Sequence, residues 1–210
     1  MKTRVLVPVI LACALSACAG TSALFAKRVA EPADAFMAAI AAHCGKAYAG
    51  RIVANRPASN TPDPFEGKAL VMHVRGCSDP TRSLEVPFHV GDDHSRTWLL
   101  TRTSGGVRLK HDHRHADGSP DAMTMYGGDT SRSGTPVRQE FPVDAESIAL
   151  FSRDGRSVST ENTWSMEIHP RMFAYELARP TSALNPEGRM FRVEFDLTRP
   201  VALPPTPWGW

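Results

Sequence analysis

The feature of this sequence that most constrains its fold is a strict alternation of apolar and charged residues near the C-terminus. In the stretch RMFRVEFDL the apolar positions are Phe191, Val193, Phe195 and Leu197. Successive side chains of a strand point to opposite faces, so this pattern predicts a strand with one face in the core and the other in water. The same period recurs through most of the chain. It predicts ten strands, at residues 48–54, 68–74, 83–90, 96–103, 106–115, 122–127, 137–143, 163–169, 173–179 and 191–197.

Ten short antiparallel strands in one domain must hide the edges of their sheet. Closure into a barrel does this most completely, so the predicted class is an all-β fold with one or two short helices, built as an antiparallel β-barrel. A β-sandwich is the alternative arrangement of the same strands. The long meander resembles the calycin group of lipocalin-like barrels, and this resemblance implies an interior that accepts a small apolar ligand.

Two segments interrupt the alternation and are expected to be helical. Pro32 and Asp34 begin an alanine-rich segment that ends before Gly45. Its apolar face carries Phe36, Met37 and Ile40, and we expect this helix to plug or cover the barrel. The second segment is 144–153, with Asp144 as the expected N-cap. Its mixed apolar face carries Ile148, Leu150 and Phe151.

The first residues have the pattern of an export signal. Lys2 and Arg4 precede an apolar run at 5–15 that is too short to span a bilayer. The run ends in LSAC, which resembles the lipobox of bacterial lipoproteins. The resemblance implies cleavage before Cys18, a lipid on its thiol and, with Ala19 next, attachment to the outer membrane facing the periplasm. A secretory signal without lipid is the alternative.

These features divide the chain into a signal peptide at 1–17, a lipidated tether at 18–31, a single domain at 32–199 and a tail rich in proline and tryptophan at 200–210. The prolines of the tail are expected to prevent it from continuing the sheet, and its tryptophans are expected to lie over the barrel. Removal of the signal takes two of the 24 basic and none of the 22 acidic residues, so the formal charge falls from +2 to zero. A neutral chain has no general attraction to nucleic acid.

The cysteine count leaves one pair for the folded domain. Cys13 leaves with the signal and Cys18 carries the lipid, so Cys44 and Cys77 remain together in an oxidising compartment. We predict that these two are bonded. A metal site that uses His43 with Cys44 is the rival interpretation, and it lacks a second closely spaced pair of ligands.

Three histidines at alternate positions are the clearest candidates for chemistry. In GVRLKHDHRH the residues His111, His113 and His115 share the parity of the apolar positions, which places them inside the barrel or at its rim. Adjacent members can share a zinc ion, whereas the outer two lie about 13 Å apart along a regular strand. A His-x-His pair on a strand also resembles the cupin pattern. A third ligand would come from His89, His94 or Asp121.

Ligand-binding candidates lie near the expected barrel opening. The glycine-rich loop at 125–135 contains Tyr126 and Asp129, and Trp98 is a candidate from the preceding strands. The sequence also resembles exported proteobacterial lipoproteins carrying CGKA, RLKHDHRH and MYGGDT, which implies no particular activity. The leading hypothesis is a lipid-anchored periplasmic barrel that binds a small apolar or amphipathic ligand and needs no cofactor. The alternatives are a zinc-dependent hydrolase and an envelope scaffold without ligand.

Overall fold

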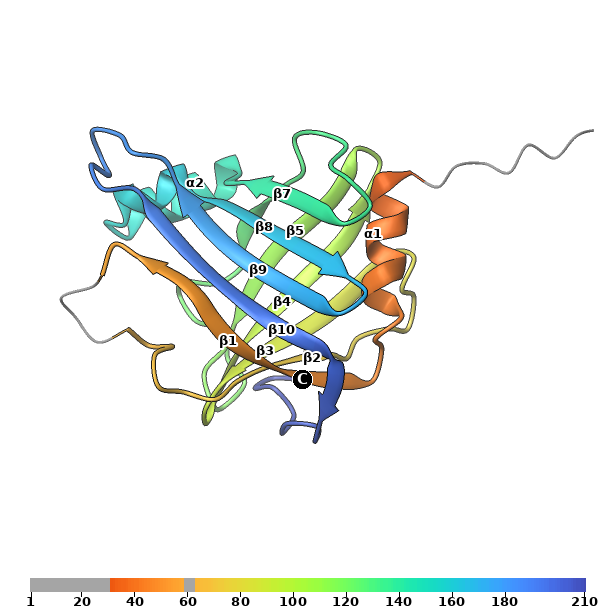
Figure 1. Ribbon diagram of the computed structural model, residues 1–210. Helices are drawn as coiled ribbons and strands as arrows, with labels where there is room; N and C mark the ends of the chain where they lie inside the picture. Colours follow the sequence, from red (N-terminus) through yellow and green to blue (C-terminus); the bar gives the residue numbers. More distant parts are fainter. Residues whose placement is uncertain (1–30, 59–62) are drawn as a thin grey trace, which may run out of the picture.

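A computed structural model describes residues 31–58 and 63–210, and its fold is an antiparallel β-barrel of ten strands (Figure 1). The predicted signal peptide, Cys13, the lipid site Cys18 and nearly all of the tether lie outside the described residues. The strands are β1 (Lys46–Arg56), β2 (Leu70–Val74), β3 (Ser83–Val90), β4 (Asp93–Thr103), β5 (Gly106–His113), β6 (Tyr126–Asp129), β7 (Arg138–Pro142), β8 (Thr163–His169), β9 (Met172–Arg179) and β10 (Arg189–Val201). The all-β barrel class predicted from the alternation is therefore confirmed, and the sandwich is not formed.

The sheet is a meander that is closed by its first and last strands. The strand order is β6-β5-β4-β3-β2-β1-β10-β9-β8-β7, so strands that are neighbours in sequence pair, except β6 and β7, and β1 also pairs with β10. Two register shifts in β1, between Tyr48 and Gly50 and between Ile52 and Ala54, bend the strand along β10. The two free edges, β6 and β7, face each other and form a seam.

The seam between β6 and β7 is sealed by the start of helix α2 (Ala145–Arg153). The buried hydroxyl of Ser147 accepts a hydrogen bond from the Gly127 N–H at 2.8 Å, and the Asp144 N–H donates to the Gly127 carbonyl at 3.0 Å. A Cβ at Gly128 would overlap the Pro142 carbonyl oxygen, so glycine is required where the two edges approach. The helix thus satisfies backbone groups that a neighbouring strand would otherwise pair.

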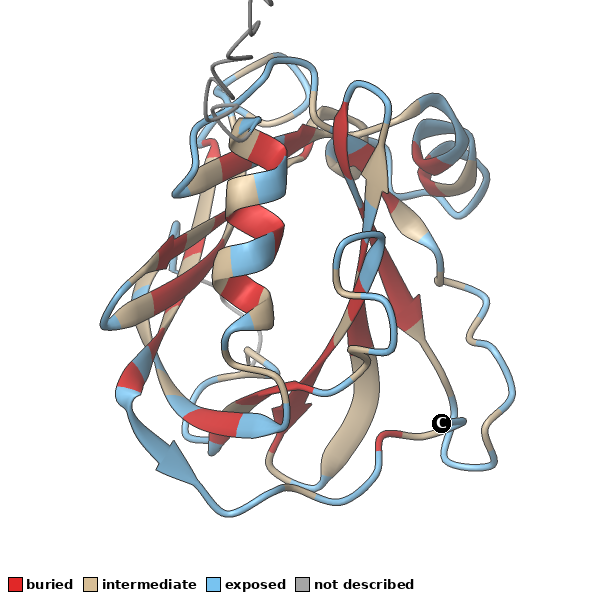
Figure 2. Ribbon diagram, turned by 90° about the vertical axis from the view of Figure 1, so that its right-hand side faces the viewer, coloured by how far each residue is buried: buried red, intermediate tan, exposed pale blue. Residues whose placement is uncertain are grey.

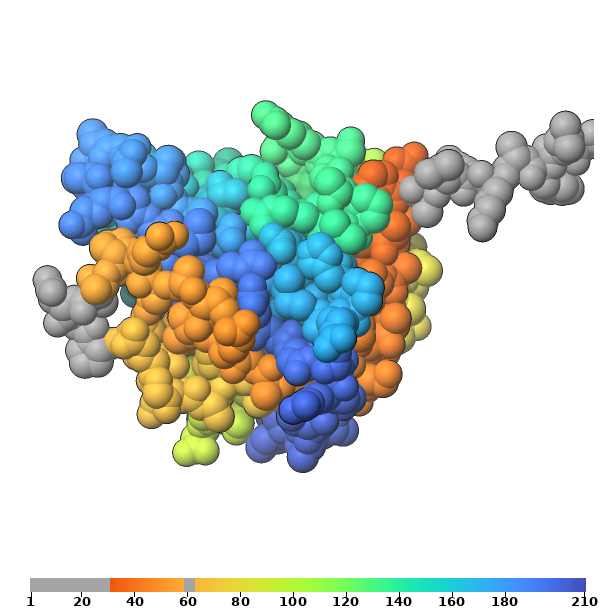
Figure 3. Space-filling model, viewed as in Figure 1, coloured from red at the N-terminus to blue at the C-terminus, as the bar shows by residue number. Residues whose placement is uncertain are grey.

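The alternation predicted for the last strand is found in β10. Phe191, Val193, Phe195 and Leu197 all belong to the buried core. The strand is longer than predicted, because it continues through Pro200, paired with Tyr48, to Val201, paired with Ala47. The expectation that the prolines stop the sheet is wrong for these first two tail residues, since a proline near a strand end removes only one donor. The remaining tail packs on the barrel wall (Figure 3), and the Trp208 N–H donates to the His94 carbonyl at 3.0 Å.

Helix α1 (Pro32–Ala41) lies across one end of the barrel, as the sequence predicted (Figure 2). Phe36, Met37 and Ile40 are buried in the same core as the barrel residues. Asp34 in the first turn accepts a hydrogen bond from Arg102 Nε at 2.6 Å, which ties the helix to β4. Gly45 follows the helix with φ +76°, a conformation that glycine adopts without strain.

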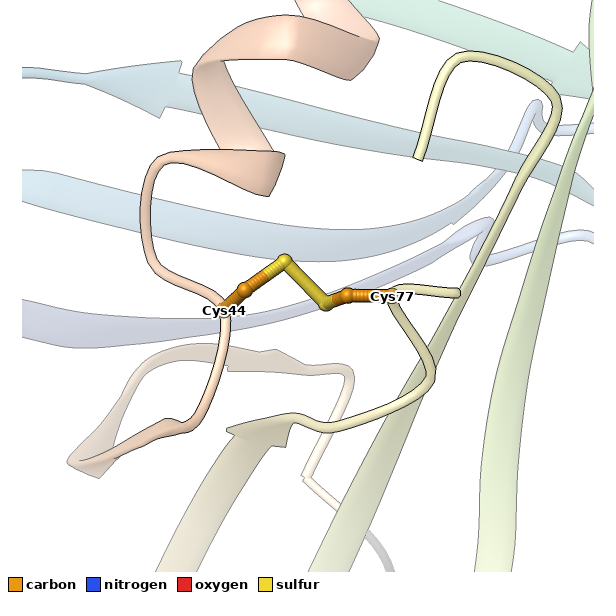
Figure 4. The surroundings of a disulfide bond; sticks show 2 residues. All are labelled: Cys44 and Cys77. Atoms are coloured by element: carbon orange, nitrogen blue, oxygen red, sulfur yellow. A yellow bond between two sulfur atoms is a disulfide. The ribbon is translucent and has the colours of Figure 1, made fainter. Parts of the chain in front are cut away.

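A disulfide joins Cys44, after helix α1, to Cys77, between β2 and β3 (Figure 4). The two residues are 33 positions apart in sequence, and their Cα atoms are separated by 6.2 Å. The predicted pair is therefore present, and the rival metal site on Cys44 is excluded because its thiol is consumed. His43 instead contacts the Tyr48 hydroxyl at 2.6 Å.

Two local predictions are corrected by the structure. The apolar face expected for helix α2 is only partly buried: Phe151 and Ser147 are buried, whereas Ile148 is exposed. The inner face of the helix covers only the seam and the pocket, and this area is too narrow to bury Ile148 as well. The strand expected at 122–127 begins only at Tyr126 and continues to Asp129. Met125 has a positive φ of 57°, so the chain turns there before it joins the sheet.

Candidate functional site

Strand β5 carries the histidines that the sequence singled out, and its alternation places two of them inside the barrel. His111 is buried, and His113 is partly buried on the same face as Val107 and Leu109. The strand ends at His113, so His115 does not extend the row. His115 lies exposed at the start of the turn at 115–119, where its N–H donates to the Ser119 carbonyl at 2.9 Å.

His111 is held as a neutral ring by two hydrogen bonds. Its Nδ1 lies 3.1 Å from the Tyr126 carbonyl oxygen, which can only accept, so Nδ1 carries the proton. Its Nε2 then accepts the hydroxyl proton of Tyr175 at 2.8 Å. Burial lowers the pKa of His111 to about 3, with the neighbouring His113 as a smaller cause. Both ring nitrogens are thereby occupied by protein groups.

His113 forms the second polar pair of the interior. The Tyr126 hydroxyl lies 3.0 Å from His113 Nε2. Burial raises the pKa of Tyr126 to about 12, so the hydroxyl keeps its proton and is able to donate it to the ring. Burial, followed by the charge of Arg96, lowers the pKa of His113 to about 4. Two histidines thus position two tyrosines, and all four groups are neutral near neutral pH.

The candidate zinc ligands do not come together. His89 lies on the outer face of β3, buried beside His94, with 2.8 Å between their Nδ1 atoms. His89 has the polar parity of this strand, which favours exposure to water, yet it is buried because His94, whose ring faces Trp208 of the tail, lies beside it. Within residues 31–58 and 63–210, no group of three or more His, Cys, Asp or Glu side chains is arranged to hold a metal ion. The predicted His-x-His zinc arrangement is therefore not formed in this part of the chain.

The middle of the barrel is filled by aromatic side chains. Trp98 stacks on Phe88 and on Tyr175, with ring centroids 4.9 and 4.5 Å apart. Phe173 and Phe195 complete this cluster, and all five rings are buried. Trp98, expected to contact ligand, is thus a core residue. The filled centre limits any ligand to an end of the barrel.

A pocket of about 230 Å³ is lined in part by residues of α2 and of the short helix η1 (Ser157–Glu161). Helix α2 lies at the end of the barrel opposite helix α1 (Figure 1). The walls of the pocket are aromatic and apolar, its rim is polar, and the principal lining residues are Phe65, Met123, Tyr126, Phe151, Arg156, Ser159, Asn162, Trp164, Tyr175, Leu177, Arg179, Arg189 and Phe191. Larger hollows of about 640, 510, 490 and 370 Å³ lie elsewhere, beside Arg138, helix α1, Arg51 and Arg56. They are open to solvent, and of the described residues that line them one, Phe195, is aromatic.

Tyr126 and Asp129, the other two predicted ligand-binding residues, lie on opposite sides of the barrel wall. Tyr126 lines the pocket and links it to both interior histidines. Asp129 lies outside the barrel, where both carboxylate oxygens accept hydrogen bonds from Arg108 at 2.6 and 2.8 Å. The sequence placed Asp129 at the opening because it assigned this segment to a loop. The segment is strand β6, and the alternation turns Asp129 outward.

The sequence did not identify several residues of the pocket as site residues. Trp164 and Tyr175 have the apolar parity of β8 and β9, and this was a usable signal for an interior position. Arg156, Arg179 and Arg189 carried no such signal, because their convergence depends on the barrel register and on the position of η1.

Comparison of the chain with protein-family models, with curated proteins and with solved structures finds no match. None of the helices in the described residues has the length and apolar character needed to cross a membrane.

Proposed function

We propose that this protein binds a small amphipathic molecule in the pocket at the open end of its barrel. The observation that carries the proposal is the pocket itself, with aromatic walls inside and polar groups at the rim. Small-molecule sites combine mostly apolar walls with a few polar groups that orient the ligand. The volume of about 230 Å³ lies below the range of roughly 300 to 1,000 Å³ for drug-sized ligands, which favours a smaller molecule.

The interior histidines support this proposal as positioning residues. His111 holds the Tyr175 hydroxyl and the Tyr126 carbonyl, while His113 holds the Tyr126 hydroxyl. The rings of both tyrosines line the pocket, so the hydrogen bonds fix part of its wall. A wall fixed before the ligand arrives reduces the ordering that binding requires.

A neutral fluorescent probe, N-phenyl-1-naphthylamine, tests the proposal. Saturable fluorescence enhancement is expected with the purified full-length protein. Met123→Trp places a large ring in the pocket and should abolish the enhancement. Leu203→Trp adds the same ring at an exposed tail position and serves as the matched control. Enhancement that survives Met123→Trp would contradict the assignment, and no saturable binding by the wild type would favour a scaffold without ligand.

We also propose that the protein is attached to the outer membrane, facing the periplasm, through a lipid on Cys18. The signal pattern ending in LSAC supports this, and the Cys44–Cys77 disulfide agrees with an oxidising compartment. Two acyl chains are sufficient for stable anchoring at about 0.8 kcal/mol per buried methylene. Mass spectrometry of the mature N-terminus should find a lipidated cysteine that is lost in Cys18→Ala and retained in Cys13→Ala. An unmodified terminus at residue 18 would contradict the proposal.

A further inference from the structure

Three arginines border the pocket, and two of them are direct neighbours in the sheet. Arg179 ends β9, Arg189 begins β10, and the register pairs these two residues. Arg156 follows helix α2 at the same opening. Like charges opposite each other on adjacent strands are unfavourable, so this pair needs a compensating negative group.

The compensation within the described residues is incomplete at Arg179. Arg156 pairs with Asp154 at 2.7 Å. Arg189 donates to Asn55 Oδ1 at 2.7 Å and lies 4.0 Å from an Asp63 carboxylate oxygen. In residues 31–58 and 63–210, Arg179 has no carboxylate oxygen within 4.0 Å, and its side chain donates only from Nε, to Asn162 Oδ1 at 2.5 Å. Burial and then the charge of Arg189 lower the pKa of Arg179.

The outer wall of the same sheet shows how this chain pairs its arginines elsewhere. Arg138 contacts Glu140, Glu167 and Glu176, and Arg192 contacts Glu167, Glu176 and Glu194. Each of these two guanidinium groups has three carboxylate partners. Arg179 belongs to the same sheet but projects at the pocket, where the charge of Glu161 partly offsets the lowering of its pKa by burial, although no carboxylate oxygen of the described residues lies within 4.0 Å of it.

We propose that the ligand of this pocket carries one carboxylate, bound by Arg179, and a flat apolar body that packs on Phe65 and Tyr126. This inference rests on the proposed ligand-binding function. A guanidinium group presents donors in a planar fork that matches a carboxylate. Among the three arginines at the pocket, Arg179 is the one without a carboxylate oxygen within 4.0 Å, which corresponds to a single negative charge on the ligand. Phe65 and Tyr126 are the partly exposed aromatic rings among the residues that line the pocket, and such a wall suits an aromatic body.

Two probes of matched shape separate the carboxylate from the apolar body. Isothermal titration of the full-length protein with 2-naphthoate and with naphthalene-2-methanol compares a carboxylate with a neutral hydroxymethyl group on the same rings. We expect 2-naphthoate to bind at least about tenfold more tightly, the usual scale of a hydrogen bond to a charged group. Equal affinities would overturn the carboxylate inference while leaving the pocket assignment intact. Binding of neither probe would instead contradict the proposed function.

Substitution of Arg179 tests whether this residue binds the carboxylate of the ligand. Arg179→Met should weaken 2-naphthoate roughly tenfold to a hundredfold and change naphthalene-2-methanol by less than about threefold. Arg171→Met removes an exposed arginine from the β8–β9 turn and should alter neither probe. Equal weakening of both probes by Arg179→Met would show a structural role and overturn the inference.

A measurement on the wild type covers the case in which Arg179→Met fails to fold. Added salt screens an ion pair at a pocket mouth and leaves an apolar contact nearly unchanged. The affinity for 2-naphthoate should therefore fall as salt is raised from about 0.01 to 1 M, while that for naphthalene-2-methanol stays within about threefold. A salt response shared by both probes would overturn the inference.

Discussion

The two ends of this barrel are built from the same strands but differ in how they are covered. At one end helix α1 inserts Phe36, Met37 and Ile40 into the core, and a disulfide fixes the chain that follows it. At the other end helix α2 seals only the seam, and the rings of Phe65 and Tyr126 remain partly exposed beneath a rim of arginines. One end is closed by apolar burial, and the other keeps space and unpaired charge.

The difference separates the residues that stabilise the fold from those that form the candidate site. Closing an end with apolar side chains contributes roughly 25 cal/mol per Å² of buried surface. Leaving the other end open gives up part of that contribution, as binding sites commonly do when function requires an accessible surface. Substitutions at the α1 end should therefore act on unfolding, and those at the α2 end on ligand affinity.

The largest expected effect compares one substitution at the two ends. Phe36→Ala leaves a cavity in the closed end and should lower the free energy of unfolding by about 3 to 5 kcal/mol. Phe65→Ala at the pocket end removes a partly exposed ring that packs against Phe191, with ring centroids 4.8 Å apart, and should cost about 1 to 2 kcal/mol. Urea denaturation of the two variants measures both values.

Probe binding completes that comparison. Phe36→Ala, measured where it remains folded, should bind N-phenyl-1-naphthylamine like the wild type. Phe65→Ala should bind it more weakly, because the ring forms part of the pocket wall. Equal losses of stability, or a loss of binding confined to Phe36→Ala, would break the division between the two ends.

The second effect concerns the disulfide at the closed end. Replacing both cysteines, Cys44→Ala with Cys77→Ala, should lower the free energy of unfolding by about 3 to 4 kcal/mol on the chain-entropy account. The bond lies away from the pocket, so probe affinity should not change. Denaturation of the double variant, beside the wild type with and without reductant, gives the measurement. A variant as stable as the oxidised wild type would contradict the assignment of this bond to the closed end's stability.

The fold could be read from the sequence because its signal is local. A period of two at Phe191, Val193 and Phe195 reports a strand with one buried face, and Asp144 marks a helix start through its own side chain. The errors lie where the surroundings decide. Pro200 stays in the sheet because β1 is there to pair with it, and His89 is buried because of its neighbour His94 and the distant tail.

The candidate site was only partly predictable for the same reason. Alternation places His111 and His113 inside the barrel, and the glycine-rich segment at 125–135 placed Tyr126 near the opening. Alternation does not reveal that both histidine rings are hydrogen-bonded to tyrosine hydroxyls. Nor does it reveal the pairing of Arg179 with Arg189, which depends on the register of two strands joined by a long loop.

The third effect uses pH to examine the polar interior near the pocket. The pKa of His111 is about 3 in the folded protein, against an ordinary value of 6.5. As pH falls below about 6.5, the unfolded chain takes up a proton that the folded protein refuses, so stability decreases by roughly 1 kcal/mol per pH unit. Between about pH 6.5 and 5 the loss from this residue should approach about 2 kcal/mol, above the range in which carboxylates titrate.

A comparison of His111→Gln with the wild type isolates the contribution of His111 to the fall in unfolding free energy at low pH. The variant lacks the titrating ring, so its unfolding free energy should fall less steeply over the same interval, with the remaining slope due to other buried histidines such as His113 and His89. Denaturation at several pH values gives both slopes. Identical slopes would mean that His111 is not buried as a neutral ring.

The smallest effect tests whether the seam, the one part of the open end that is closed, is sealed by helix α2. Ser147→Ala removes the hydroxyl that accepts the buried Gly127 N–H at 2.8 Å, and an unsatisfied buried donor should cost about 1 to 2 kcal/mol. Ser152→Ala on the same helix removes an exposed hydroxyl bonded to the Ile148 carbonyl and should cost less than about 0.5 kcal/mol. Faster amide exchange at Gly127 in Ser147→Ala alone would locate the loss at the seam. Equal stability of the two variants would show that the contact between β6 and β7 does not depend on the Ser147 hydroxyl of helix α2.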